Sequence, residues 1–100
     1  MATKIKKYAV IGGQYKYHCY GTTDSLQAAK VLATKSQEYW DNWQGWHTPR
    51  IYRGEDCFVH YDEYGRENII PIVSIGGYRA APAYVKDGRK WMPWSEGRWV

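Results

Sequence analysis

The sequence lacks any long apolar run. Nowhere in its 100 residues does a window approach the roughly 18 apolar residues that a membrane-spanning helix needs. No apolar stretch of signal-peptide length follows the basic start at Lys4, Lys6 and Lys7. The sequence therefore predicts a cytoplasmic protein with no membrane partner.

Cysteine is also scarce, because Cys19 and Cys57 are the two in the chain. They allow a single bridge, whereas small secreted domains that depend on disulfides usually carry several. We expect two reduced, partly buried thiols. Adjacent His18 and Cys19 would point to opposite faces of a strand, and Cys57 with His60 lacks a second ligand pair at zinc spacing. We therefore expect no metal site.

Recognised catalytic and cofactor motifs are missing as well. Cys57 with His47 or His60 as its base lies in no recognised signature, and the neighbouring Glu55-Asp56 opposes a thiolate. Gly12-Gly13 lacks the spaced glycines and the lysine of a phosphate loop. We predict a protein that is not an enzyme and takes no cofactor.

Aromatic residues, in contrast, are abundant at 17%, with 6 Trp and 10 Tyr. They supply the burial that a disordered chain lacks. We predict one compact domain over residues 1–94, followed by a tail at 95–100 that is poorly ordered.

Charge is unevenly spread behind a net value of +4. Residues 1–35 carry six Lys and one Asp, residues 36–70 three Arg and seven acids, and residues 71–100 five basic and two acidic side chains. Duplex-DNA binders more often concentrate basic residues on one recognition element, because contacts to phosphates supply much of their affinity. Duplex DNA is therefore a disfavoured partner.

The first half of the chain predicts a β-hairpin and a long helix. Lys4–Ile11 and Tyr15–Tyr20 alternate as two strands around a glycine turn. Residues 25–42 are predicted as a helix, and Asp24 with Gln27 has the spacing of a capping box. The residues that recur at steps of three and four on its predicted buried face are Leu26, Ala29, Leu32, Ala33, Ser36, Trp40 and Trp43.

The second half predicts short strands. They are Arg50–Arg53, Cys57–Tyr61, Asn68–Val73, Tyr84–Lys86 and Arg89–Trp91. Pro71 makes its strand an edge strand or a bulge, and Asp87-Gly88 is a strong hairpin-turn signal. We predict an α+β fold, in which an N-terminal β-hairpin and one long helix pack on a mostly antiparallel sheet of short strands.

Three Trp follow one another at steps of three, at Trp40, Trp43 and Trp46. They cannot all face inward from one helix end, because each step of three rotates the position by about 300°. In one interpretation Trp40 and Trp43 fill the gap between helix and sheet, and Trp46 folds back over the core. In the other, exposed indoles beside Arg50 and Arg53 stack on a base while the guanidiniums bind phosphate. The full predicted ligand-binding set is Tyr15, Lys16, Tyr17, Trp43, Trp46, His47, Arg50, Tyr52, Arg53 and Arg79.

The segment from Tyr39 to Arg53, with Glu55-Asp56 after it, resembles small proteins encoded by phages and prophages of gut-type bacteria. The resemblance implies a counter-defence role in the cytoplasm of a bacterial host cell. Proteins of this class either inhibit a host immune protein or sequester nucleotide immune signals. The resemblance assigns no functional residue.

Three functions stay open. The first is a non-enzymatic homo-oligomer that binds and sequesters a nucleotide-type immune signal through aromatic stacking and contacts from Arg and Lys to phosphate. The second is an anti-CRISPR-like inhibitor that binds a host defence protein through exposed Trp, Tyr and Arg. The third is a single-stranded nucleic-acid binder.

Overall fold

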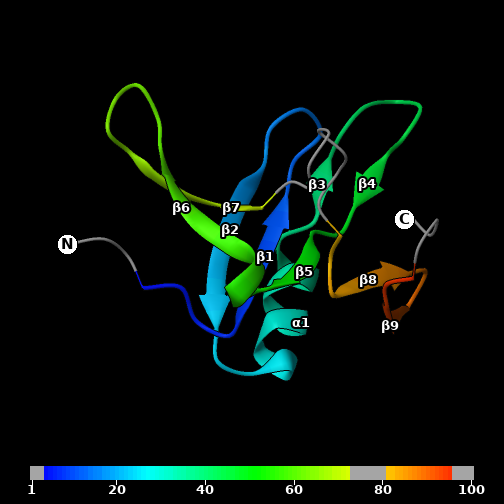
Figure 1. The fold of residues 1–100 in the computed structure, drawn as a ribbon. Helices are drawn as coiled ribbons and strands as arrows, with labels where there is room; N and C mark the ends of the chain where they lie inside the picture. The colour runs from blue at the N-terminus through cyan, green and yellow to red at the C-terminus, as the bar shows by residue number, and fades with distance from the viewer. Residues whose placement is uncertain (1–3, 73–80, 96–100) are drawn as a thin grey trace.

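The computed structural model describes residues 4–72 and 81–95 (Figure 1). Along the chain the elements are β1 (Tyr8–Gly12), β2 (His18–Thr23), α1 (Leu26–Lys35), β3 (Glu38–Tyr39), β4 (Trp46–His47), β5 (Arg50–Arg53), a 3-10 turn (Gly54–Asp56), β6 (Cys57–Tyr61), β7 (Glu67–Pro71), β8 (Tyr84–Asp87) and β9 (Lys90–Pro93). Predictions that fall on Val73, on Arg79 and on residues 96–100 of the tail lie outside the described residues.

The main sheet has five strands in the order β2-β1-β5-β8-β9, and its neighbouring strands are antiparallel. Two further hairpins, β3–β4 and β6–β7, form separate two-stranded sheets and project on either side of the β1–β2 loop (Figure 1). The predicted α+β class, the N-terminal hairpin and the mostly antiparallel pairing are confirmed.

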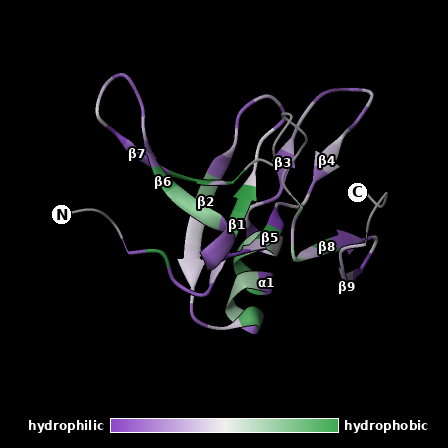
Figure 2. Cartoon of the chain, in the orientation of Figure 1, coloured by the Kyte–Doolittle hydropathy of each residue, from purple (hydrophilic) through white to green (hydrophobic). Residues whose placement is uncertain are grey.

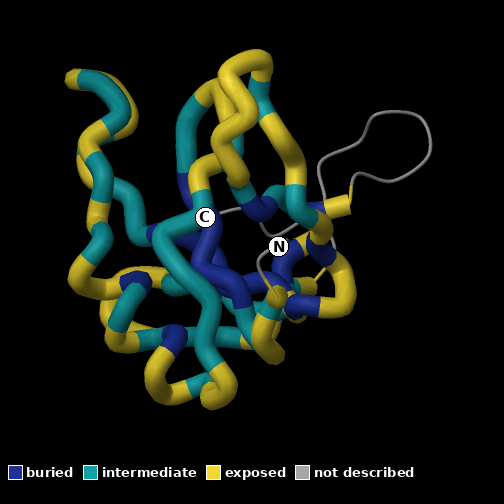
Figure 3. Tube along the Cα trace, turned by 90° about the vertical axis from the view of Figure 1, so that its left-hand side faces the viewer, coloured by how far each residue is buried: buried dark blue, intermediate teal, exposed yellow. Residues whose placement is uncertain are grey.

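The sheet is covered on both faces. On one face α1 packs against β1 and β5, where Ala29 and Ala33 meet Val10 and Ile51. On the other face the β6–β7 hairpin closes the second cluster, which consists of Ala9, Ile11, Tyr52, Cys57 and Ile69. Neighbouring residues of β1 enter opposite clusters because successive side chains of a strand alternate between faces. Hydrophobic residues gather in β1, α1 and β6 (Figure 2), and burial falls from the central strands toward the hairpin tips (Figure 3).

The helix is shorter than predicted, because it ends at Lys35 and not at Asn42. Its N-cap is Ser25, whose hydroxyl oxygen accepts the Ala28 amide hydrogen at 3.1 Å, so the predicted Asp24 capping box is wrong. The predicted inner face holds for Ala29 and Ala33, which are buried. Beyond the helix, residues 38–47 form a β-hairpin.

The later strands lie close to their predicted positions. Gly88 adopts a φ of 63°, as its predicted turn role requires. Because Asp87 pairs with Lys90, the two turn residues are Gly88 and Arg89, one position later than predicted. Pro71 ends β7 opposite Cys57, at the margin of a two-stranded sheet.

Cys19 and Cys57 are both free thiols, half-buried and buried respectively. Burial raises the pKa of both, that of Cys57 to about 12. No helix within residues 4–72 and 81–95 is long and apolar enough to cross a membrane.

Candidate functional site

The β3–β4 hairpin is built around a turn that begins at Asp41. The Asp41 carboxylate accepts the amide hydrogens of Trp43 and Gln44 at 2.9 and 2.6 Å, and the hydrogen bond from Gln44 lowers the pKa of Asp41. The Gly45 amide donates to the Asp41 carbonyl at 2.7 Å, and Gly45 has a φ of 70°. An Asp side chain that accepts hydrogen bonds from the backbone amides two and three residues later favours a turn and disfavours a helix, and a Gly in the left-handed conformation adds to this preference.

Glu38 attaches this hairpin to the sheet. Its carboxylate accepts hydrogen bonds from the Gly13 amide at 2.7 Å, from the Tyr20 hydroxyl at 2.6 Å and from Trp40 Nε1 at 3.0 Å. Gly12 leaves room for this approach, since a Cβ there would lie 2.6 Å from Glu38 Oε1. The carboxylate therefore joins the end of β1, the middle of β2 and the hairpin itself.

This arrangement changes the pKa of Tyr20. Burial and the hydrogen bond to Glu38 raise the pKa of Tyr20 to about 12. The neutral phenol is therefore the form that the folded protein favours at all ordinary pH values.

The two faces of the hairpin differ. Tyr39 and Trp46 are cross-strand partners with ring centroids 5.4 Å apart, and both are exposed. On the opposite face Trp40 stacks on His47, with centroids 3.9 Å apart, and both are half-buried. Trp43 is 96% exposed at the tip and Trp46 is 67% exposed. We call Tyr39, Trp43 and Trp46 the aromatic hairpin surface.

The β1–β2 loop lies beside this hairpin. Gln14 Nε2 donates to Asp41 Oδ2 at 3.2 Å, which bridges the loop and the turn. A groove of about 500 Å³ separates them, and its lining residues are Gly13, Gln14, Tyr15, Lys16, Tyr17, Trp40, Asp41 and Gln44. Three predicted site residues, Tyr15, Lys16 and Tyr17, therefore lie next to the predicted tryptophan segment, and Tyr15 is 90% exposed.

The predicted arginines do not join the indoles. Arg50 is only 7% exposed, and Tyr52 is 2% exposed within the core cluster, so neither presents its side chain to a ligand. Arg53 pairs with Tyr8 at the start of β1, whereas Gly12 at the other end of β1 adjoins Glu38. Arg53 instead lines a separate groove of about 800 Å³ with Lys4–Tyr8, and approaches Glu55 at 4.0 Å. The predicted pairing of exposed indoles with the guanidiniums of Arg50 and Arg53 is therefore wrong, and the predicted contribution of Arg79 lies outside the described residues.

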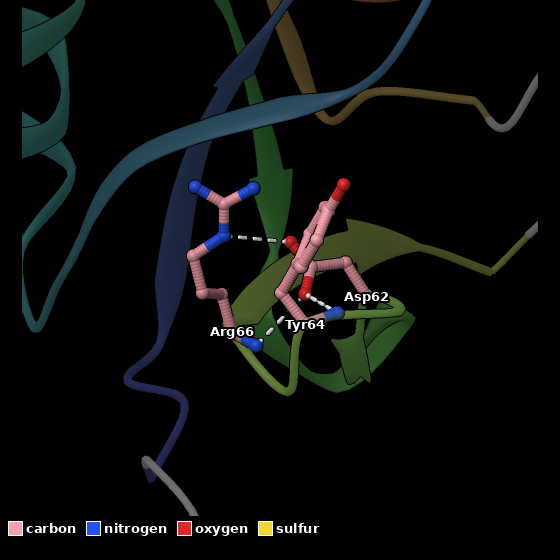
Figure 4. Close-up of polar contacts among 3 residues, drawn as sticks. All are labelled: Asp62, Tyr64 and Arg66. Carbon is pink, nitrogen blue, oxygen red and sulfur yellow. Dashed lines mark hydrogen bonds and ion pairs between the residues drawn. The ribbon is translucent and has the colours of Figure 1, made fainter.

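The β6–β7 hairpin carries a second ordered tip, at the loop of residues 62–65 that the sequence predicts between these strands, although none of its residues belongs to the predicted ligand-binding set. Asp62 accepts hydrogen bonds from the Tyr64 and Arg66 amides and from Arg66 Nε, the last at 3.0 Å, and the Arg66 guanidinium lies 5.2 Å from the centre of the Tyr64 ring (Figure 4). The backbone hydrogen bond from Arg66 lowers the pKa of Asp62. An Asp two residues before an aromatic and three before Gly65 is the signal that identifies this turn.

The described ranges, 4–72 and 81–95, contain no group of three His, Cys, Asp or Glu side chains that could hold a metal ion. In comparisons with protein-family models, curated proteins and solved structures, none matches this chain.

Proposed function

We propose that this chain is a non-enzymatic binding protein that docks on a partner protein through the aromatic hairpin surface. The observation that carries this proposal is the 96% exposure of Trp43 together with the 67% exposure of Trp46, on one hairpin. Large exposed rings are costly to leave in water, and Trp and Tyr are the residue types enriched among interface hot spots. The resemblance to phage-encoded proteins supports a bacterial host defence protein as the partner.

The way the rings are held also supports a docking role. Glu38 fixes the hairpin to β1 and β2, and Asp41 orders its turn. A partner therefore meets a surface whose backbone is already ordered, which lowers the entropy cost of association. The three rings are exposed and do not line the groove beside the hairpin, which is the geometry of a protein interface more than of a small-molecule site.

The nucleotide-sequestration hypothesis finds less support at this hairpin. The groove beside it offers one cation, Lys16, and the Asp41 carboxylate lies in its lining. A phosphate there would meet one positive and one negative side chain. The homo-oligomeric state stays a prediction, since the chain is described alone.

Site-specific photo-crosslinking tests the docking proposal. A benzophenone amino acid in place of Trp43 is exposed to a lysate of a gut bacterium, and a matched protein carries the same group in place of Tyr64, an exposed aromatic on the other hairpin tip. We expect a discrete protein adduct from position 43, absent from position 64 and reduced by an excess of unlabelled wild-type protein. The Trp46→Ala substitution should weaken the adduct.

Adducts of equal yield from both positions would indicate nonspecific contact and would contradict the proposal. An adduct that disappears on nuclease treatment would assign the surface to nucleic acid instead. Native mass spectrometry of the purified complex reports its stoichiometry.

A further inference from the structure

A third groove, of about 480 Å³, lies between α1 and the β8–β9 hairpin. Its lining residues are Gln27, Lys30, Val31, Thr34, Lys35, Lys86, Arg89 and Trp91. None of them belongs to the predicted ligand-binding set. The groove is separate from the aromatic hairpin surface, with which it shares no residue.

The helix contributes one continuous stripe to this groove. Its lining positions start at Gln27 and continue three, four, seven and eight residues later, which is the repeat of a single helix face. Ala29 and Ala33 lie on the opposite side and are buried against the sheet. Packing of the small alanines therefore turns Lys30 and Lys35 toward the groove.

The β8–β9 hairpin contributes the other wall. Lys86 and Trp91 are cross-strand partners, so their side chains share one face of the hairpin. Trp91 packs against the core cluster beneath α1 and is half-buried, which fixes the ring while it still lines the groove. Arg89 stands in the tight turn next to Gly88, whose φ of 63° closes that turn.

The charge of this lining is of one sign. Three Lys and one Arg line the groove, and its lining contains no carboxylate. Two acidic residues, Asp24 and Glu55, line the groove of Arg53, and Asp41 lines the groove beside the aromatic hairpin surface. Two ion pairs, Arg53–Glu55 and Arg66–Asp62, form within residues 4–72 and 81–95, and neither involves a cation of the α1 groove.

We infer that this groove binds nucleoside phosphates, with a base against Trp91 and phosphate oxygens on Lys30, Lys35, Lys86 and Arg89. An indole fixed by packing offers a stacking surface to any base, and each stacked base contributes about a 5- to 150-fold gain in affinity. The guanidinium binds phosphate as a planar fork, and the lysines act as point charges. The Gln27 amide adds a neutral hydrogen-bonding group to the lining, whereas the Thr34 hydroxyl donates to the Lys30 carbonyl at 2.8 Å. The same chemistry fits a free nucleotide and a single-stranded nucleic acid.

Equilibrium binding to two probes tests this inference. Fluorescence anisotropy follows a fluorescein-labelled eight-nucleotide oligothymidylate at 50 mM salt, and calorimetry follows adenosine triphosphate. The test variant is Lys35→Gln/Arg89→Gln, both exposed positions. The matched control is Lys4→Gln/Lys6→Gln. These two exposed lysines line the groove of Arg53, and their substitution removes the same total charge.

We expect the test variant to weaken binding at least 10-fold and the control to weaken it less than 3-fold. Loss of two phosphate contacts should also flatten the slope of log Kd against log salt by about 1.5. Binding of the oligonucleotide alone assigns the groove to single strands, and comparable binding of adenosine triphosphate assigns it to free nucleotides. Either result supports the inference.

Trp91→Leu should reduce oligonucleotide affinity about 5-fold or more through lost stacking. Circular dichroism confirms that this variant folds, and if it does not, the charge variants decide the question. The inference is overturned if neither probe binds at 50 mM salt, or if the test and control variants weaken binding equally. Neither result affects the crosslink at Trp43, so this inference and the docking proposal fail separately.

Discussion

The β3–β4 and β6–β7 hairpins are attached to the main sheet in different ways. Both stand outside the five-stranded sheet on either side of the β1–β2 hairpin (Figure 1), and in each a polar side chain bonds to the backbone of that hairpin. Glu38 accepts from the Gly13 amide. Asn68 accepts from the Cys19 amide at 3.2 Å and donates to the Tyr17 carbonyl at 2.9 Å, so its amide group pairs with the edge of β2 as another strand would.

The difference lies in what supports each polar contact. The β6–β7 hairpin also buries Cys57 and Ile69 in a core cluster. In contrast, every residue of the β3–β4 hairpin is at least partly exposed. The β6–β7 hairpin is therefore held chiefly by burial of apolar surface, and the β3–β4 hairpin chiefly by hydrogen bonds to one carboxylate. The comparison indicates that the β3–β4 hairpin depends more strongly on a single residue.

The largest effect should come from Glu38→Ala. The substitution removes the carboxylate that accepts all three hydrogen bonds. Its loss should lower the local stability of the hairpin by about 3 kcal/mol. Hydrogen exchange of the Trp40 amide, which donates to the Gly45 carbonyl, measures this loss. Glu38→Gln keeps one acceptor oxygen and should lose less. Unchanged exchange in both variants would show that the carboxylate does not hold the hairpin.

Asn68→Ala should have a smaller effect on the other hairpin. It leaves the Tyr17 carbonyl and the Cys19 amide without this partner, at a cost of about 1–2 kcal/mol, while Ile69 still anchors the strand. Urea denaturation measures the change in the free energy of unfolding. Asn68→Asp serves as the control, because it keeps the acceptor and loses the donor. A larger loss from Asn68→Ala than from Glu38→Ala would reverse the comparison.

Alkaline pH should weaken the β3–β4 attachment through Tyr20. The pKa of Tyr20 in the folded protein is about 12, against an ordinary value of 10.0, so its contribution to stability is full below pH 10 and is lost as pH rises toward 12. Urea denaturation at several pH values between 9 and 12 should show a steeper decline for the wild type than for Tyr20→Phe. Cys57, whose pKa is raised to about 12 by burial, titrates in both proteins and cancels in the difference. Parallel declines would exclude the Tyr20 contribution.

The smallest effect should come from Trp43→Ala. The Trp43 ring is 96% exposed, so its removal should change the free energy of unfolding by less than about 0.5 kcal/mol. Trp40→Ala is the contrasting variant, because that ring stacks on His47 and donates to Glu38. Thermal denaturation compares the two. Equal losses of thermal stability in the two variants would mean that the exposed Trp43 ring also stabilises the fold.

Much of the fold was predictable because its signals are local. The strands at Arg50–Arg53 and Cys57–Tyr61 coincide with the predicted ones, since alternation and flanking turns depend on neighbouring residues. The α1 core face was also predictable, from the spacing of Ala29 and Ala33. The Asp87-Gly88 signal identified its turn to within one residue, because a left-handed glycine has few alternatives.

The candidate site was predicted less well, for a physical reason. The spacing of Trp40 and Trp43 suits a helix face, and periodicity alone extended α1 through them. The alternative was present in the sequence as an Asp followed by a Gly four residues later, at Asp41 and Gly45. The Asp41 turn and three hydrogen bonds to Glu38 from distant or adjacent donors outweigh helical propensity there.

The amino-acid sequence by itself determined the α+β class, the places of most strands, the inner face of α1 and the presence of more aromatic rings than the core holds. These follow from alternation, periodicity and composition, which act over a few residues at a time. Only the tertiary structure decided that Arg50 and Tyr52 are buried, that Trp43 and Trp46 are exposed on a hairpin, and that lysines from α1 face Trp91 from β9. Those outcomes depend on which segments distant in the chain pack together, and no local pattern encodes that.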